Sequence, residues 1–126
     1  PYSYIRYADI PFKQDYFTAR RTCECLDSHL MATDTVESWG WYLAITANSN
    51  TYWLGLDDLE EENNFVWADG KTIKPDIRNL IFMNGKPDGD GHCFFKVTFT
   101  VYMDDTDCYR NLSSVCEQFQ FLNSAC

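Results

Sequence analysis

Two short runs of sequence decide the fold: Tyr52-Trp53-Leu54-Gly55-Leu56 and Phe65-Val66-Trp67-Ala68-Asp69-Gly70. Both runs are rich in aromatic and branched side chains, which favour strands. The acidic segment Asp57–Glu62 separates them, and the Asp-Gly pair that closes the second run is a turn signal. We therefore predict two strands, over residues 51–56 and 64–67, joined by an acidic turn.

The chain before these strands has the pattern of helices. Residues 12–26 place apolar side chains at steps of three and four, among them Tyr16 and Cys23. A second helix follows Thr33 or Asp34, either of which can cap it, and it ends at Asn48-Ser49-Asn50. Residues 1–10 are predicted to form a strand.

After the two central strands the pattern is one of further strands and long loops. Residues 93–98 and 100–103 are predicted to pair as a hairpin, and residues 112–119 to form a last strand. Asn-Gly and Asp-Gly pairs mark a long loop region from Gly70 to Gly91, and loops of this length are often functional. Two helices followed by several strands with long loops indicate the α+β class, in a single domain over residues 1–126.

Composition and charge argue against several classes of function. Hydrophobic residues make up 45% of the 126 residues, which is ordinary for a globular protein. The formal net charge is −9, and no basic cluster is longer than Arg20-Arg21, so we expect no binding to nucleic acid or anionic membranes. No apolar run approaches the ~20 residues of a membrane span, so no membrane insertion is expected.

The cysteines indicate an oxidising compartment. An even number of them in a small acidic chain is typical of a disulfide framework, and Cys23-Glu24-Cys25 is too short for a Cys-x-x-Cys zinc knuckle. Spacing alone does not select one pairing among the many possible. The chain begins at Pro1 rather than Met, and Asn111-Leu112-Ser113 is a glycosylation sequon. We therefore predict a processed, secreted protein.

Six short motifs follow one another along nearly the whole chain. They are Tyr16-x-x-Ala19-x-x-x-Cys23 followed by His29-Leu30, Tyr52-Trp53-Leu54-Gly55-Leu56, Phe65-Val66-Trp67-Ala68-Asp69-Gly70, Gly85-Lys86-Pro87-Asp88, Met103-Asp104-Asp105-Thr106-Asp107-Cys108 and Val115-Cys116-Glu117. Their order and the cysteine spacing resemble the C-type lectin-like domain family. The resemblance implies the fold of that family, with two helices, small antiparallel sheets and a long loop region.

The resemblance also implies a disulfide pairing. The implied pairs are Cys23–Cys116 and Cys93–Cys108. Cys25 and Cys126 are left over, and a step of two residues along a helix turns Cys25 away from the first pair. The two remaining cysteines either bond each other or make interchain bonds. We predict a disulfide-linked homodimer or heterodimer.

In the family, the tripeptide at Lys86-Pro87-Asp88 reads the sugar. The Glu-Pro-Asn form suggests mannose-type ligands and Gln-Pro-Asp galactose-type ones. Lys-Pro-Asp resembles the variant of some bivalve C-type lectins, which favour N-acetylglucosamine and N-acetylgalactosamine. Chemically, Asp88 can accept from the acetamido N–H, and Lys86 can donate to its carbonyl. An aromatic ring such as His92 or Tyr102 would stack on the sugar. The predicted carbohydrate-binding residues are Lys86, Asp88, Asp90, His92, Tyr102, Asp104 and Asp105.

Calcium is expected to be dispensable or accessory. In the family, the tripeptide and a later polar pair, here Asp104-Asp105, coordinate calcium, which takes hard oxygen ligands. An ammonium has no acceptor, so Lys86 cannot be a ligand, and we infer that it takes over the electrostatic role of calcium. An auxiliary calcium site is implied at Asp58 and Glu62, which Asp90 or the Asp of the tripeptide would complete. The alternative for this segment is a solvated acidic turn.

Nothing in the sequence indicates an enzyme. His29 and His92 are the two histidines, and His29 matches a structural position in the family. No nucleophile elbow, P-loop or dinucleotide fingerprint is present, and adjacent strand residues such as Asp104 and Asp105 point to opposite faces. We predict a secreted lectin for glycans that carry GlcNAc or GalNAc, acting as an agglutinin in innate defence. The alternative is a protein of the same fold that binds a protein or mineral surface.

Overall fold

The computed structural model describes residues 5–83, 86–87, 91–98 and 100–119. The strands pair into two antiparallel sheets, in the order β1-β7-β2 and β4-β3-β5-β6. In chain order the elements are β1 (Ile5–Gln14), α1 (Tyr16–Cys25), β2 (His29–Leu30), α2 (Val36–Ile45), β3 (Trp53–Asp57), β4 (Val66–Trp67), α3 (Pro75–Ile81), β5 (Cys93–Lys96), β6 (Met103–Thr106) and β7 (Leu112–Phe119). This is the predicted α+β architecture.

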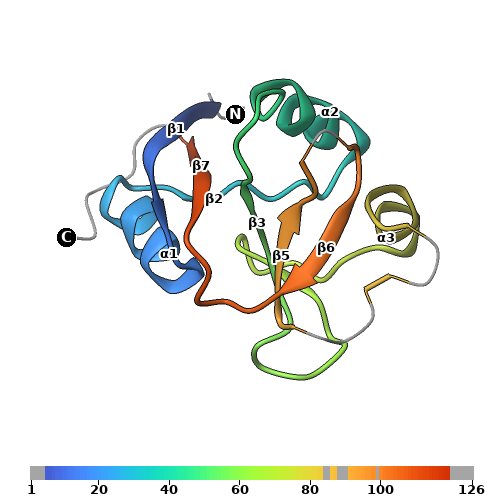
Figure 1. Cartoon of the computed structure of the whole chain (residues 1–126). Coiled ribbons are helices and arrows are strands. Elements are labelled where there is room, and N and C mark those ends of the chain that lie inside the picture. Colours follow the sequence, from blue (N-terminus) through green and yellow to red (C-terminus); the bar gives the residue numbers. More distant parts are fainter. Residues whose placement is uncertain (1–4, 84–85, 88–90, 99, 120–126) are drawn as a thin grey trace.

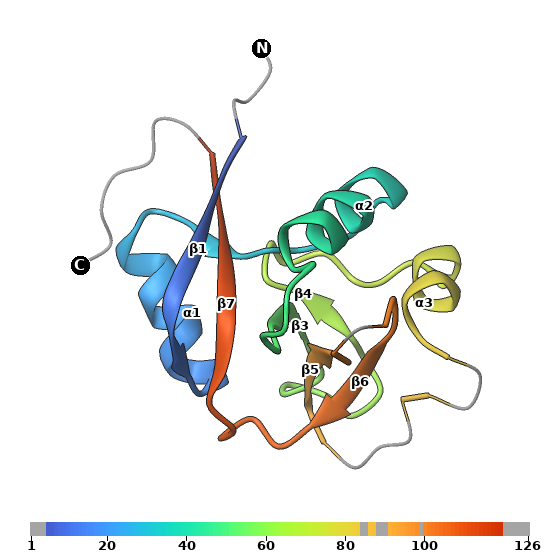
Figure 2. The same cartoon turned by 45° about the horizontal axis from the view of Figure 1, so that its top comes forward.

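The two sheets lie side by side, with the helices around them (Figure 1). β1 and β7 come from opposite ends of the chain and pair with each other, and α1 lies beside them (Figure 2). α3 lies beyond β6, the edge strand of the second sheet. Within the part of the chain that the structure describes, no helix combines the length and the apolarity needed to cross a bilayer.

Two helices begin where local hydrogen bonding favours it. The side chain of Asp15 accepts from the Thr18 N–H and caps α1, which buries Tyr16 on its inner face. Thr35 caps α2 and forms a capping box with Ser38. The predicted caps at Thr33 or Asp34 were therefore wrong by one or two residues, because Thr35 has the reciprocal partner three residues later.

A third helix, α3, lies in the region that was predicted to be loop. Pro75 occupies its first turn, where a missing N–H costs nothing. Ile77 and Ile81 are buried one turn apart and hold the helix against the core. The prediction of two helices was therefore wrong by one, because seven residues give too short a pattern to recognise.

Three phenylalanines fix α3 against the second sheet. Phe94 of β5 contacts both Phe65, before β4, and Phe82, at the end of α3, with ring centroids 5.2 and 5.4 Å apart. Edge-to-face pairs of this kind contribute about 0.5–1.5 kcal/mol each beyond the area they bury. The segment that follows α3 and carries Lys86 therefore leaves from a rigid base.

The glycine of the second motif lets the two sheets approach closely. A Cβ on Gly55 would lie 2.5 Å from the carbonyl oxygen of Leu30, and the Gly55 N–H donates to Met31 at 3.0 Å. No side chain fits at this distance, because contacts under 3 Å force the backbone apart. This contact explains why a strand that is otherwise large and apolar carries a glycine at its centre.

Two disulfides close the fold with the pairing that the resemblance implied. Cys23–Cys116 joins α1 to β7, and Cys93–Cys108 joins the start of β5 to the segment after β6. Cys25 is also disulfide-bonded, which in this single chain favours an intrachain bond over an interchain bond. Cys126 lies outside the described residues.

The hairpin of β5 and β6 differs from its prediction in the second strand. β6 runs from Met103 to Thr106, whereas the sequence placed it at residues 100–103. Thr100 instead belongs to the connecting turn, where its N–H donates to Val97. The register pairs Lys96 with Met103 and Cys93 with Thr106, so the acidic pair of the fifth motif lies on β6 itself.

Candidate functional site

The predicted site residues gather along β6 and the chain that precedes β5. Lys86 follows α3, His92 immediately precedes β5, and Tyr102 immediately precedes β6. Asp104 and Asp105 lie on β6, opposite Phe95 and Phe94 of β5. Asp88 and Asp90 lie outside the described residues, so their predicted roles stay predictions.

Lys86 and Asp104 form the charged centre of this region. The Nζ of Lys86 lies 3.6 Å from Oδ2 of Asp104, and the two side chains are 35% and 29% exposed. The Lys86 N–H donates to the carbonyl of Met83 at 3.0 Å, and the Lys86–Pro87 peptide is cis. An ammonium and a carboxylate are thus held together and half open to solvent, where a ligand can reach both.

Asp105 faces the other way and holds the chain before β5. It is 7% exposed, and its Oδ2 accepts from the Gly91 N–H at 2.8 Å. A Cβ on Gly91 would lie 2.2 Å from the Thr106 carbonyl oxygen, so only glycine allows this approach. The opposite orientation of Asp104 and Asp105 on β6 matches the prediction from strand geometry. Through its hydrogen bond to the Gly91 N–H, Asp105 positions the chain before β5.

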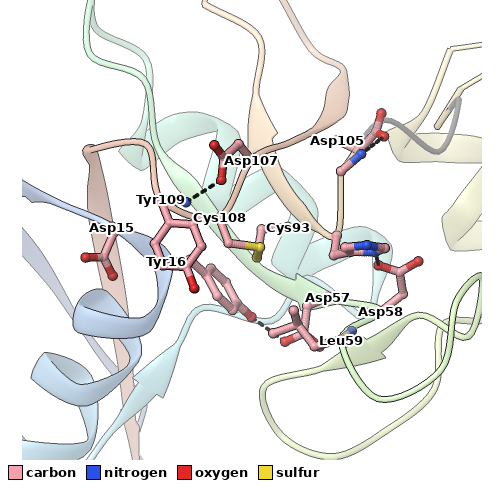
Figure 3. The surroundings of a disulfide bond; sticks show 12 residues. Asp15, Tyr16, Asp57, Asp58, Leu59, Cys93, Asp105, Asp107, Cys108 and Tyr109 are labelled. Carbon is pink, nitrogen blue, oxygen red and sulfur yellow. Dashed lines mark hydrogen bonds and ion pairs between the residues drawn. A yellow bond between two sulfur atoms is a disulfide. The ribbon is translucent and has the colours of Figure 1, made fainter.

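His92 and Asp58 form a second polar link. Figure 3 shows Asp58 in the surroundings of the Cys93–Cys108 disulfide. Nδ1 of His92 lies 3.0 Å from Oδ1 of Asp58, whose side chain is 5% exposed while that of His92 is 51% exposed. The other oxygen of Asp58 accepts from the Asn63 N–H at 3.0 Å. Asp58 therefore ties the acidic turn to the start of β5.

These contacts do not fit a calcium ion at the positions that the resemblance implied. Both oxygens of Asp58 already accept hydrogen bonds, and Glu62 is exposed. Lys86 places a positive charge beside Asp104, which repels a second cation. Over residues 5–83, 86–87, 91–98 and 100–119, no three His, Cys, Asp or Glu side chains form a group that could hold a metal. Asp90, the third predicted ligand, lies outside these ranges.

A hollow of about 350 Å³ lies between the end of α3 and the residue that precedes β6. Asn79, Phe82 and Met83 line it together with Tyr102, whose side chain is partly exposed. Because the Lys86 N–H is bonded to Met83, the hollow and the charged centre share one stretch of backbone. Asn79 and Met83 were missed at the sequence level, since they depend on α3, whose signals were a Pro at its start and Ile77 and Ile81 one turn apart.

His29 lies away from this region, between β2 and β7. Its Nδ1 lies 2.8 Å from the Leu30 carbonyl, and its Nε2 lies 3.5 Å from a carboxylate oxygen of Glu117. Burial raises the pKa of Glu117, and the nearby His29 opposes this shift. These contacts are within the fold, in agreement with a structural role for His29.

The same disulfide region holds a buried tyrosine, Tyr16, which the sequence indicated only as a core position of the first helix (Figure 3). The hydroxyl of Tyr16 donates to Oδ2 of Asp57 at 2.6 Å, and burial, with the Asp57 charge, raises the pKa of Tyr16 well above its usual value. The phenol therefore stays protonated at physiological pH. It connects α1 to β3 and offers no general base.

Comparisons with known proteins agree with this architecture. The family model of the lectin C-type domain matches residues 13–118. Lectin BRA-3 of Megabalanus rosa is 26% identical over 76 residues, which are 60% of this chain and 47% of that protein. C-type lectin domain family 4 member M of Gorilla gorilla gorilla is 24% identical over 81 residues, 64% of this chain and 21% of that protein. The match thus spans less than half the length of either relative.

A solved structure shows the same fold over nearly the whole chain. The carbohydrate-recognition domain of the human scavenger receptor C-type lectin has a TM-score of 0.78 to this chain at 25% identity, and the alignment covers 95% of each chain. The family match covers the Cys23–Cys116 and Cys93–Cys108 disulfides, the whole of the second sheet and the Lys86 region. This chain belongs to the C-type lectin domain family, whose domains are non-enzymatic.

Proposed function

We propose that this domain binds glycans bearing N-acetylglucosamine or N-acetylgalactosamine, and that it does so without a required calcium ion. The observation that carries the proposal is the ion pair of Lys86 and Asp104. It provides a fixed positive charge next to carboxylate oxygens, which is the electrostatic combination that a calcium ion supplies elsewhere in the family. The charge here belongs to the protein itself.

The acetamido group offers complementary chemistry to such a centre. Its carbonyl oxygen accepts from the Lys86 ammonium, which has three donors, while Asp104 accepts from a sugar hydroxyl. Hydrogen bonds with one charged partner are shorter and stronger than neutral ones. We assign Asp88 to the acetamido N–H, as its place in the tripeptide predicts.

The hollow lined by Tyr102 supports the acetamido preference. An acetamido sugar carries a methyl group that a plain hexose lacks, and the exposed ring of Tyr102, in the hollow that Met83 also lines, gives that methyl an apolar surface. Tyr102 therefore takes the stacking role that the sequence left open between two side chains. His92, bonded to Asp58, is assigned to the rim.

Calcium is not required in this proposal. Asp58 and Glu62 do not fit a calcium ion, because both oxygens of Asp58 already accept hydrogen bonds and Glu62 is exposed. Lys86 binds the sugar directly, because its ammonium can donate hydrogen bonds to the sugar without a metal ion. Removal of calcium therefore leaves the binding intact.

We further propose that the protein is secreted and acts as an agglutinin of innate defence. Agglutination needs two sites on one particle, since linked sites gain avidity from effective concentration. We propose a dimer that provides them. Because Cys25 is already disulfide-bonded within the single chain, this dimer does not need an interchain bond through Cys25. Elution at dimer mass in size-exclusion chromatography supports the dimer, and elution at monomer mass would contradict it.

Calorimetric titration tests the function directly. N-acetylglucosamine is titrated into the domain with calcium and again with EDTA, and glucose serves as the sugar without an acetamido group. We expect equal heats in the two buffers and weaker binding of glucose. Binding only with calcium would refute the metal-free mechanism. No heat with N-acetylglucosamine or N-acetylgalactosamine would instead favour a protein or mineral surface as the ligand.

A further inference from the structure

A cavity of about 320 Å³ lies at the other end of the β5–β6 hairpin, between its turn and α2. Its apolar lining comes from Leu43 and Ala47 at the end of α2 and from Val101 in the turn. Lys96, Asn48 and Thr100 complete the lining. This volume is in the range of sites for small molecules, and apolar walls with few polar groups are typical of them.

The lysine in this lining is unusual because it is buried. Lys96 is 6% exposed, and its Nζ donates to the carbonyl of Thr46, the C-cap of α2, at 3.0 Å. The end of a helix carries partial negative charge, which explains why a cation is tolerated there. Burial nevertheless lowers the pKa of Lys96.

Lys96 lacks the partner that a buried cation normally has. Across the described part of the chain no carboxylate forms an ion pair with it, and the Thr46 carbonyl uses one of its three donors. A buried charge without a counter-ion is costly. A negatively charged group in the adjoining cavity would complete the pairing.

From this geometry we infer a second binding site, for a small carboxylic acid with an apolar tail. The carboxylate accepts from Lys96, and the tail lies against Leu43, Ala47 and Val101. The site is separate from the Lys86 region, so it does not depend on sugar binding. Its ligand is chosen by charge complementarity at one end and by the apolar walls at the other.

Octanoate and 1-octanol both carry an eight-carbon chain, but only octanoate is charged. Comparing them separates the contribution of the carboxylate to binding from that of the apolar tail. In calorimetric titrations at pH 7 we expect saturable binding of one octanoate per chain, and binding of 1-octanol weaker by at least about tenfold, since a charge-assisted hydrogen bond is lost. Lys96→Met should weaken the binding of octanoate by at least about tenfold. The matched control Lys74→Met, at an exposed lysine, should leave the affinity for octanoate unchanged.

A second variant keeps the test decisive if Lys96→Met does not fold. Val101 is exposed, so Val101→Glu should fold and place a repelling carboxylate at the rim. Weaker octanoate binding with unchanged N-acetylglucosamine binding supports the site. No saturable octanoate binding to the wild type would overturn the inference. Equal affinity for octanoate and 1-octanol, or unchanged octanoate binding in both variants, would overturn it as well.

Discussion

Replacement of Lys86 by methionine separates its role in recognition from its role in folding. The ion pair with Asp104 joins side chains that are 35% and 29% exposed, and pairs at this exposure contribute at most about 1 kcal/mol to stability. The midpoint of thermal unfolding should therefore fall by no more than about 6 °C.

The cost to binding should be larger. A hydrogen bond from the ammonium to the acetamido carbonyl is worth about 1.5–3 kcal/mol, because one partner is charged. At about 1.4 kcal/mol per factor of ten, Lys86→Met should weaken the binding of N-acetylglucosamine by roughly 10- to 150-fold. Methionine keeps the length of the side chain and removes only the charge and its donors.

The assay is calorimetry in EDTA, with thermal unfolding followed by circular dichroism on the same samples. Lys74→Met removes an exposed lysine of the same chain and serves as the matched control. Its sugar affinity should equal that of the wild type. Binding by Lys86→Met within twofold of the wild type, with the fold intact, would refute the assignment of Lys86 to the sugar.

Three further predictions concern contacts within the fold, two of them at the site and one between β2 and β7. Gly91→Ala should displace the chain before β5, because its Cβ would meet the Thr106 carbonyl at 2.2 Å; we expect a loss of about 1–3 kcal/mol of stability in denaturant unfolding and weaker sugar binding. Asp58→Asn should cost about 1–3 kcal/mol in the same assay, since two donors lose a charged acceptor, whereas the exposed Glu62→Gln should change stability by less than about 0.5 kcal/mol; equal effects would contradict the described role of Asp58. Burial raises the pKa of Glu117, so the folded state binds its proton more tightly than the unfolded chain does; the stability of Glu117→Gln relative to the wild type should therefore rise with pH between the ordinary and the raised pKa, and a flat or falling difference in pH-dependent unfolding would contradict this.

The sequence predicted most of the fold because its strong signals are local and distinct. The strands around Gly55 and Trp67, the helix that buries Tyr16 and the last strand are all present. The turn before β6 was misplaced, because Thr100 and Val101 favour strands as residue types but lie where the chain reverses. α3 was missed because a seven-residue helix depends on packing against Phe94 rather than on its own periodicity.

The site was harder to predict because it depends on contacts between distant segments. The sequence indicated that Lys86 faces an acidic group, and the structure selects Asp104 and turns Asp105 inward to Gly91. The link between His92 and Asp58 spans 34 residues and has no signal in spacing. The hollow beside Tyr102 exists only where α3 meets β6.

The most direct test of the central claim is a crystal structure of the domain with N-acetylglucosamine, grown in EDTA. The account predicts the sugar at Lys86 and Asp104, with the Lys86 ammonium within hydrogen-bond distance of the acetamido oxygen or a ring hydroxyl. It also predicts the acetamido methyl against Tyr102. A sugar bound elsewhere on the domain, or one that enters this region only when calcium is restored, would contradict it.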